Sequence, residues 1–431
     1  AISNFSGSAG DALISPYGSH VFVDARYYLQ ADQEVDPARF CIHKVGMEGE
    51  KTLTEYLREM EKERGSLRVG YDPFVVGMDM HTTYTRSLKA AGSALVPIYG
   101  NLVDAVWENR PTATSQPIYL LSDAETGRSV ADKLSAVREK MDQEEAAVLI
   151  LTKLDEIAWL TNLRGSDVSY NPVFEAYMVV ERTRATCFTR LTPGREIQAA
   201  LAPHVTFAPY EAYTETLQRI GTQTSEKIWL DPSGTTMGTR LLLPEGQQIH
   251  EARNPVVLMK ALKNEVEIAS SREAHKRAAA AKIRSLARVE RLRAAGQVVS
   301  EKAYAQMLTE EYAREEGYRD LSFATISAVG ANGAIVHYSG ANDEVALRDG
   351  ELFLVDSGTQ MGAGTTDDTR TICIGTPTER QQQLYTLVLR CHIQLARQKF
   401  PDGTSGVALD ALTRGQMWNA GLDYGHGTGH G

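Results

Sequence analysis

Two aspartates on either side of a glycine-rich turn are well placed for metal chemistry. Asp356 and Asp367 lie in ELFLVDSGTQMGAGTTDDTRTICIG, where two strand-like runs flank TQMGAG. The glycines favour a β-hairpin, and a turn at Met361 and Gly362 would place Asp356 opposite Asp367 on one face. Two carboxylates that close repel each other unless a cation lies between them, so we predict two divalent ions about 3.5–4 Å apart, as in hydrolytic sites. The alternative is a solvated acidic face, which we prefer for Asp368.

Histidines near the end of the sequence could complete such a site. His426 and His430 lie in GLDYGHGTGHG, where alternating glycines disfavour a helix. In an extended chain the two rings would lie about 13 Å apart on one face, so we expect one to bind metal and the other to contact substrate. His337, in NGAIVHYSG, is a third candidate, because an imidazole with a pKa near ~6.5 can transfer a proton or bond to a polarised carbonyl. For each histidine the alternative is an ordinary hydrogen-bonded side chain.

These residues lie in a region whose pattern predicts both helices and strands. Helix formers dominate residues 262–295 and end at Gly296, and two more helical stretches cover 300–316 and 380–399. The runs rich in β formers are 321–329, 333–340, 351–358 and 369–375. Because helices and strands do not alternate strictly, we expect an antiparallel α+β sheet here.

The first 255 residues contain a repeated pattern. NFSGS, from Asn4, resembles NLRGS, from Asn162, and VGYDPFVVGM resembles IWLDPSGTTM, which aligns Asp72 with Asp231. Between these marks each copy has β-type runs (HVFVDARYYLQA; YMVVERTRATCFT), then an amphipathic helix and another strand, as in an α/β domain. The second copy also has a helix and strand before its first mark, so we expect further residues before Ala1 to complete the first domain.

We therefore predict an α/β and α+β multidomain protein. The predicted domains are residues 1–111, 112–255 and 256–431, and a proline-containing linker, ENRPTATSQP, separates the first two copies.

Composition narrows the function classes. A formal net charge of -10 argues against a general nucleic-acid binder, and no apolar run approaches the ~18 residues of a membrane span. The four cysteines are scattered without a CxxC pair, which favours a reducing, cytoplasmic setting. FSGSAG and HGTGHG lack the spacing of phosphate or dinucleotide loops, so we expect no nucleotide cofactor. Peptides or small molecules are the expected partners.

Taken together, several segments closely resemble aminopeptidase P, the Xaa-Pro aminopeptidases of the pita-bread metallopeptidases, in their larger three-domain cytosolic form. The segments are FSGSAG, VDARYYLQA, LDEIAWLTNLRGSDVSYNPVF, LMKALKNEVEI, GAIVHYSG, VDSG with GTTDDTRT, and GLDYGHGTGHG. The resemblance covers essentially the whole chain. It implies two creatinase-like N-terminal domains, a pita-bread catalytic domain, a homodimer, and release of the first residue from peptides with proline second.

The resemblance also implies roles for the candidate residues. Asp356 and Asp367 would be metal ligands, with Asp367 bridging two ions, His430 would be the histidine ligand, and His337 and His426 would contact substrate. The ions would be manganese, with zinc or cobalt as alternatives, and an oxygen-rich ligand set with one imidazole suits manganese. A hydroxide bridging the ions would attack the carbonyl of the first residue.

The family has two further glutamate ligands beyond HGTGHG, whereas this sequence ends at Gly431. We therefore expect a truncated pita-bread domain and negligible hydrolysis by residues 1–431 alone. One alternative is a prolidase or creatinase-like enzyme on the same fold. Another is a non-catalytic pita-bread binding or dimerisation module. The duplicated N-terminal half favours aminopeptidase P over the first, and three ligands retained together speak against the second.

Overall fold

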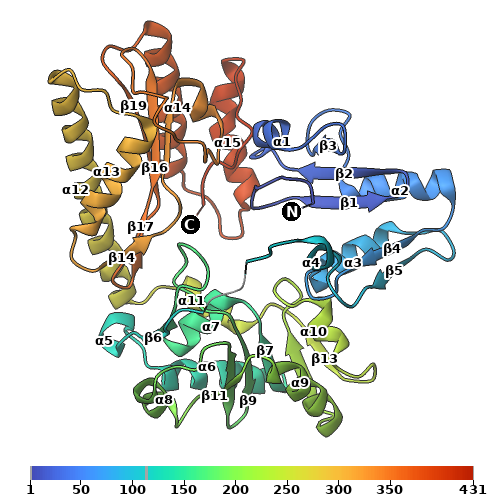
Figure 1. Ribbon diagram of the computed structural model, residues 1–431. Helices are drawn as coiled ribbons and strands as arrows, with labels where there is room; N and C mark the ends of the chain where they lie inside the picture. The colour runs from blue at the N-terminus through green and yellow to red at the C-terminus, as the bar shows by residue number, and fades with distance from the viewer. Residues whose placement is uncertain (1, 112–114, 431) are drawn as a thin grey trace.

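The computed structural model describes residues 2–111 and 115–430. They form three units that meet around the middle of the molecule, coloured blue, green, and yellow to red in Figure 1. Ala1, Gly431 and part of the predicted linker at 108–117 lie outside the described residues. Within these ranges, no helix is both long and apolar enough to cross a membrane.

The first unit holds two small sheets. β1 (Asp11–Ser15) is antiparallel to β2 (Gly18–Val23), and β2 is parallel to β3 (Cys41–Lys44). A second, parallel pair is β4 (Arg68–Tyr71) with β5 (Ala94–Pro97). The helices are α1 (Tyr28–Glu34), α2 (Leu53–Arg64), α3 (Met78–Ser87) and α4 (Leu102–Val106).

The β-type run predicted for HVFVDARYYLQA is wrong beyond Val23. The chain turns at an ion pair between Asp24 and Arg26, with 2.7 Å between carboxylate and guanidinium. Helix α1 then begins at Tyr28, because the following residues include the good helix formers leucine, glutamine and alanine.

The second unit is built on one sheet of strand order β11-β10-β9-β7-β12-β13. Its central strand, β7 (Ala146–Leu151), is buried at every residue, as in a strand covered on both faces. The other strands are β6 (Tyr119–Leu120), β8 (Leu163–Arg164), β9 (Ala176–Glu181), β10 (Ala185–Thr189), β11 (Thr206–Pro209), β12 (Lys227–Leu230) and β13 (Ile249–Glu251). The helices are α5 (Asp123–Thr126), α6 (Val130–Gln143), α7 (Leu154–Thr161), α8 (Arg195–Leu201), α9 (Ala212–Gln223) and α10 (Met237–Leu241).

The two units repeat the same order of elements. The series β1, β2, α1, β3, α2, β4, α3, β5 of the first unit corresponds to β9, β10, α8, β11, α9, β12, α10, β13 of the second. Strand directions agree as well, because β1–β2 and β9–β10 are antiparallel while β2–β3 and β10–β11 are parallel. The internal similarity read from the sequence is therefore present in the fold.

The two repeats contact each other through matching positions. The Met78 amide donates to the carbonyl of Thr235 at 2.9 Å, and the Met237 amide donates to the carbonyl of Val76 at 2.9 Å. Met237 is 159 residues after Met78, and Thr235 is 159 residues after Val76, so each bond joins the positions that the other joins in the opposite repeat. The contact therefore has the reciprocal pattern of a two-fold interface. The Asp72 and Asp231 marks of the sequence directly precede it.

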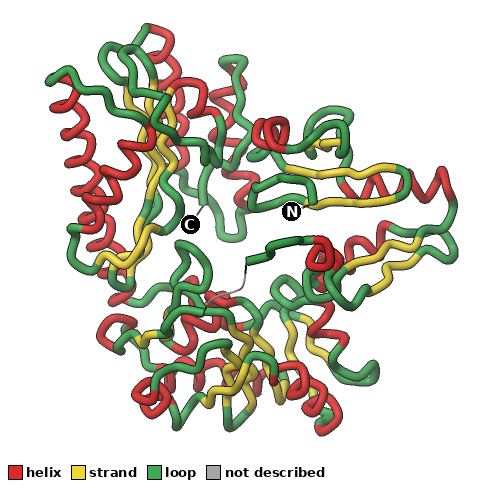
Figure 2. Tube along the Cα trace, viewed as in Figure 1, coloured by secondary structure: helices red, strands yellow, loops and turns green. Residues whose placement is uncertain are grey.

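The third unit is the α+β region. Its helices are α11 (Pro255–Ala261), α12 (Glu265–Ala294), α13 (Glu301–Ala313), α14 (Glu379–Arg397) and α15 (Gly406–Asn419). Its strands are β14 (Tyr318–Leu321), β15 (Ile326–Val329), β16 (Leu352–Ser357), β17 (Thr359–Met361), β18 (Gly364–Thr365) and β19 (Asp368–Cys373). The sheets β15-β16-β19 and β14-β17-β18 are antiparallel, which confirms the prediction. Figure 2 shows these strands between helices on either side.

The strand predicted over 333–340, which contains His337, is wrong. A short 3₁₀ turn, η1 (Gly330–Ala334), begins there and an irregular loop follows. The buried carboxylate of Glu301 accepts hydrogen bonds from the Val329 amide at 2.7 Å and from the Tyr338 hydroxyl at 2.8 Å. These bonds hold both ends of the segment, so side-chain bonding replaces the expected ladder.

Candidate metal centre

Strands β16 and β19 bring the two predicted ligands together. In their antiparallel ladder Asp356 pairs with Thr369, and Ser357 pairs with Asp368. Asp367 lies two residues before Thr369, so it is the diagonal neighbour of Asp356 on the same face. The predicted hairpin exists, but the partner of Asp356 is Thr369, two residues beyond the predicted Asp367. β17 pairs Met361 with Gly364, which moves the turn to residues 362–363.

A close backbone crossing fixes this geometry. Gly358 lies between β16 and β17, and a Cβ there would overlap the carbonyl oxygen of Thr366 and the hydroxyl of Ser322. Only glycine allows this approach. Since Thr366 directly precedes Asp367, the crossing sets where the second carboxylate lies relative to the first.

The Asp356 carboxylate is suited to a cation. Its Oδ1 atom is buried and has no hydrogen-bond partner among the described residues. Burial is the largest cause of its raised pKa; a hydrogen bond with Thr369 opposes the rise, and the charge of Asp367 adds to it. An unpartnered buried oxygen next to a second carboxylate is unfavourable without a compensating charge. The residues present therefore fit a divalent metal ion.

His430 lies beside Asp367. Its Nε2 atom is 3.4 Å from Oδ2 of Asp367, and both side chains are substantially exposed. Asp356, Asp367 and His430 thus combine two hard oxygen donors with one imidazole.

Asp368 points to the opposite face. Its carboxylate is 2.8 Å from Nζ of Lys282, whose side chain is only 4% exposed. Burial lowers the pKa of Lys282, and the bond to Asp368 opposes that shift. The interpretation of Asp368 as a solvated acid is therefore wrong, because it neutralises a buried lysine of α12.

His337 is held by the first unit. Its Nδ1 atom lies 2.8 Å from the hydroxyl of Tyr27, a residue that is 1% exposed, and the two rings meet edge to face at 5.2 Å. Burial and then the charge of Arg26 lower the pKa of His337, while Asp24 and Asp356 oppose the shift. The bond to Tyr27 ties this imidazole of the third unit to the first unit.

Sequence reasoning missed Tyr27. Its segment, VDARYYLQA, was interpreted as part of a strand, although it also belongs to the resemblance to aminopeptidase P. No spacing rule connects it to His337, because the two residues are 310 positions apart.

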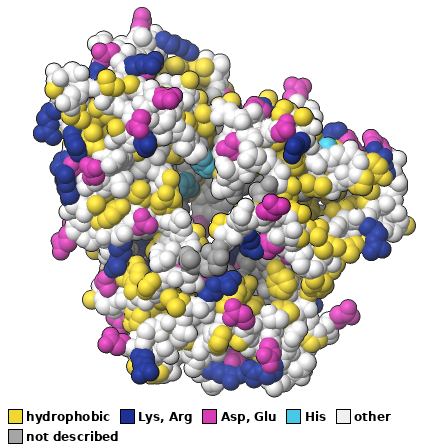
Figure 3. Space-filling view, viewed as in Figure 1, with side chains coloured by type: hydrophobic (Ala, Val, Ile, Leu, Met, Phe, Trp, Pro, Cys, Tyr) yellow, Lys and Arg dark blue, Asp and Glu magenta, His cyan; other side chains and the backbone are white. Residues whose placement is uncertain are grey.

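His426 lies on the loop after α15 and is exposed. Its Nδ1 is 2.8 Å from the Gly427 carbonyl, and Arg414 of α15 donates to the His426 carbonyl at 2.8 Å. The loop is not helical, as its glycines predicted, but it bends instead of extending. A Cβ at Gly425 would lie 3.3 Å from the Cβ of Ala25, so this loop also packs against the first unit. Figure 3 shows histidine side chains at the hollow in the middle of this face.

Comparison with known proteins follows the same division of the chain. Residues 109–267 match the creatinase/prolidase N-terminal domain, and residues 269–431 match metallopeptidase family M24. The chain is 37% identical to a probable Xaa-Pro aminopeptidase P of Laccaria bicolor, covering 100% of this chain and 67% of that protein. It is 38% identical to one of Aspergillus niger, covering 100% and 71%.

Solved structures of related peptidases have the same fold as this chain. The X-prolyl aminopeptidase from Caenorhabditis elegans, described as a cytosolic enzyme with a di-nuclear active site, matches with a TM-score of 0.93 at 32% identity, over 100% of this chain and 71% of that one. A Xaa-Pro dipeptidase from Bacillus anthracis, with a TM-score of 0.55 at 21% identity over 70% and 82%, shares the fold.

The fold and the acid pair define a metallopeptidase of family M24, with a creatinase-like N-terminal region and a pita-bread domain. Within that class, the chain belongs to the Xaa-Pro aminopeptidase P family. The resemblance recognised in the sequence and the predicted fold class are both confirmed.

Proposed function

We propose that this protein removes the N-terminal residue from peptides that carry proline at the second position. The observation that carries the proposal is the buried Oδ1 of Asp356, which has no hydrogen-bond partner among the described residues, next to Asp367 with His430 3.4 Å from it. The names of the relatives support the substrate class, because they are Xaa-Pro or X-prolyl aminopeptidases.

Two divalent ions would be held by Asp356, Asp367 and His430, and the di-nuclear site of the Caenorhabditis elegans enzyme supports that number. We propose manganese, with zinc and cobalt as alternatives. When bound, the ions supply Lewis-acid polarisation and a strong nucleophile at neutral pH. Lys282 keeps Asp368 away from them, so the two adjacent aspartates have different tasks.

The histidines would position the substrate. In the proposed arrangement Tyr27 donates to Nδ1 of His337, which leaves the Nε2–H of His337 to bond to a substrate carbonyl. In this arrangement Nδ1–H of His426 donates a hydrogen bond to the Gly427 carbonyl. Nε2 of that ring is then free to accept a hydrogen bond from the substrate. The peptide bond before proline has no N–H. A site that does not require a hydrogen bond from the nitrogen of the cleaved bond therefore suits an Xaa-Pro substrate.

Three further properties belong to the same proposal. We propose a cytoplasmic homodimer with domains at 1–111, 112–255 and 256–431, and the cytosolic description of the Caenorhabditis elegans enzyme supports the location. Residues 1–431 supply three ligands, and negligible turnover by this polypeptide alone stays a prediction. Prolidase activity and a non-catalytic binding or dimerisation role are the competing outcomes.

Three peptides test the function. The intact protein, loaded with manganese, is assayed on Xaa-Pro-Yaa, Xaa-Pro and Xaa-Ala-Yaa. We expect cleavage of the first with clear preference over the other two. Faster cleavage of the dipeptide would establish a prolidase, and no cleavage by metal-loaded protein would leave the non-catalytic reading. In parallel, turnover by the polypeptide 1–431 alone would contradict its predicted inactivity.

A further inference from the structure

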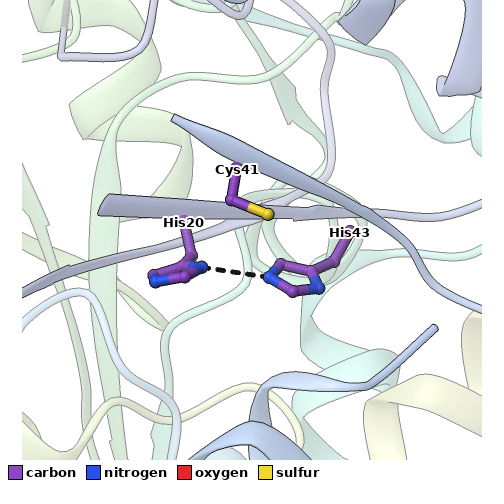
Figure 4. A group of neighbouring side chains, drawn as sticks. All are labelled: His20, Cys41 and His43. Atoms are coloured by element: carbon purple, nitrogen blue, oxygen red, sulfur yellow. Dashed lines mark hydrogen bonds between the residues drawn. The ribbon is translucent and has the colours of Figure 1, made fainter. Parts of the chain in front are cut away.

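A second cluster of metal-binding side chains lies in the first unit, away from the acid pair. His20 on β2 is the parallel-pair partner of Cys41 on β3, and His43 follows two residues later. Residues two apart on a strand point to the same face. One ligand atom of each side chain lies within 4.8 Å of the others. Figure 4 shows the three side chains turned toward one another.

The distances suit one ion. Nδ1 of His20 lies 3.0 Å from Nε2 of His43. Two nitrogens bound to zinc at ~2.0–2.1 Å with tetrahedral geometry would be about 3.3 Å apart. Binding would therefore require shifts of only a few tenths of an ångström in the two rings.

Each imidazole has a partner on its outer nitrogen. Nε2 of His20 is 2.7 Å from the hydroxyl of Tyr56, and Nδ1 of His43 is 3.3 Å from a carboxylate oxygen of Glu50. A carboxylate oxygen at this distance favours the proton on Nδ1 of His43, so Nε2 of His43 is the bare nitrogen that faces the cluster. Metal-bound histidines have such outer partners, which fix the tautomer and orientation of the ring. Phe22 also stacks on His43 with ring centroids 4.5 Å apart.

The cluster is accessible from the surface. Cys41 is exposed, and a surface hollow of about 570 Å³ is lined by Tyr17, His20 and Cys41 among others. Burial and the neighbouring His43 lower the pKa of His20, which keeps this ring ready to bind a cation.

We propose that Nδ1 of His20, Nε2 of His43 and Sγ of Cys41 bind one zinc ion, with a fourth position open to solvent. The Cys41 thiol gives its proton to solvent when the Sγ–zinc bond forms, as thiolate ligands do. A thiolate with two imidazoles selects zinc over manganese, whereas the carboxylates of the third unit accept either. The ion would clamp β2 to β3 beside α2, and the competing arrangement is a metal-free hydrogen-bonded relay from Tyr56 through both rings to Glu50.

Cobalt substitution tests the site without using activity. The intact protein is stripped of metal, titrated with Co²⁺ and followed for a thiolate-to-cobalt charge-transfer band in the near ultraviolet. We expect the band in the parent protein, in Asp356→Asn, and in His81→Asn, a histidine control from the same unit. We expect it to be lost in Cys41→Ser and weakened at least tenfold in affinity in His43→Gln.

Thiol protection provides the second measurement. Zn²⁺ should slow alkylation of Cys41 at least tenfold in the parent protein and in Asp356→Asn, but not in His43→Gln. Absence of the band in the parent protein, or a band that persists in Cys41→Ser, would overturn the zinc site. Alkylation of Cys41 at equal rates with and without Zn²⁺ would also overturn the zinc site. The metal-free hydrogen-bonded relay would then be the remaining interpretation.

Discussion

The hydroxyl of Tyr27, buried in the first unit, lies 2.8 Å from Nδ1 of His337 in the third unit. The N-terminal repeat therefore contacts the third unit at one of the candidate substrate histidines. In the proposed site Tyr27 would be a positioning residue, because its hydroxyl contacts the His337 imidazole.

Tyr27→Phe should lower kcat/KM on Xaa-Pro-Yaa by roughly 2- to 10-fold, the equivalent of one hydrogen bond. Tyr28→Phe is the matched control, since the Tyr28 hydroxyl bonds to the Val45 carbonyl inside the first unit. Steady-state kinetics and melting temperatures are measured for both variants. Equal losses of kcat/KM in the two variants would show that Tyr27 has only a structural role.

The adjacent aspartates should give opposite phenotypes. Asp367→Asn should remove at least one bound metal ion with little change in stability, because its side chain is 41% exposed. Asp368→Asn should retain the metal and lower the free energy of unfolding by about 3 kcal/mol, because it leaves buried Lys282 without its counter-charge. Elemental analysis and denaturant unfolding check both, and metal loss from Asp368→Asn at native stability would refute the assignment.

Gly358→Ala should destabilise the third unit by at least about 3 kcal/mol, because the new Cβ would overlap the Thr366 carbonyl. Gly415→Ala is the control in the same unit. It lies within α15 with no atom within 4 Å of the added Cβ, so it should stabilise by up to about 1 kcal/mol. Urea unfolding of both variants measures the difference, and a near-neutral Gly358→Ala would show that the crossing can relax.

Lys133 should make stability depend on alkaline pH. Burial, followed by the charge of Arg164, lowers its pKa to about 8 in the fold, against 10.5 when unfolded. Between these values the unfolded chain binds a proton that the folded chain does not, so the folded state gains stability as pH rises. Relative to Lys133→Met, the free energy of unfolding should increase by at most about 3 kcal/mol across this window. Parallel pH profiles for the two proteins would contradict the buried ammonium.

Local patterns predicted α12, α13 and α14 of the third unit, but not α15. The expected ranges 262–295 and 380–399 became α12 and α14, since helix formers and the stop at Gly296 act within a few turns. The duplication was also readable, and its second mark, at Asp72 and Asp231, directly precedes the contact between the repeats. The sequence predicted that Asp356 lies in a hairpin near Asp367, but not which residue pairs with it. The register of the hairpin depends on the backbone crossing at Gly358.

Long-range contacts explain what the sequence did not reveal. The loop around His337 depends on Glu301, and its imidazole depends on Tyr27, neither of which is near it in sequence. Cys41 and His43 alternate as strand neighbours do, but only the pairing of β2 with β3 adds His20. The ligand roles of Asp356, Asp367 and His430 and the substrate roles of His337 and His426 stay predictions.

The reciprocal bonds around Met78 and Met237 resemble those between two identical subunits, yet both sides belong to one polypeptide. Dilution cannot separate them, and a substitution on one side has no mirror image on the other. The sides have diverged accordingly: Phe74 packs over Gly238, whereas Ser233, at the matching position, bonds back to Asp231 at 2.7 Å. Because the two sides are tethered, they need not obey the symmetry of a true pair of subunits, and the first repeat carries Tyr27, whose hydroxyl contacts His337.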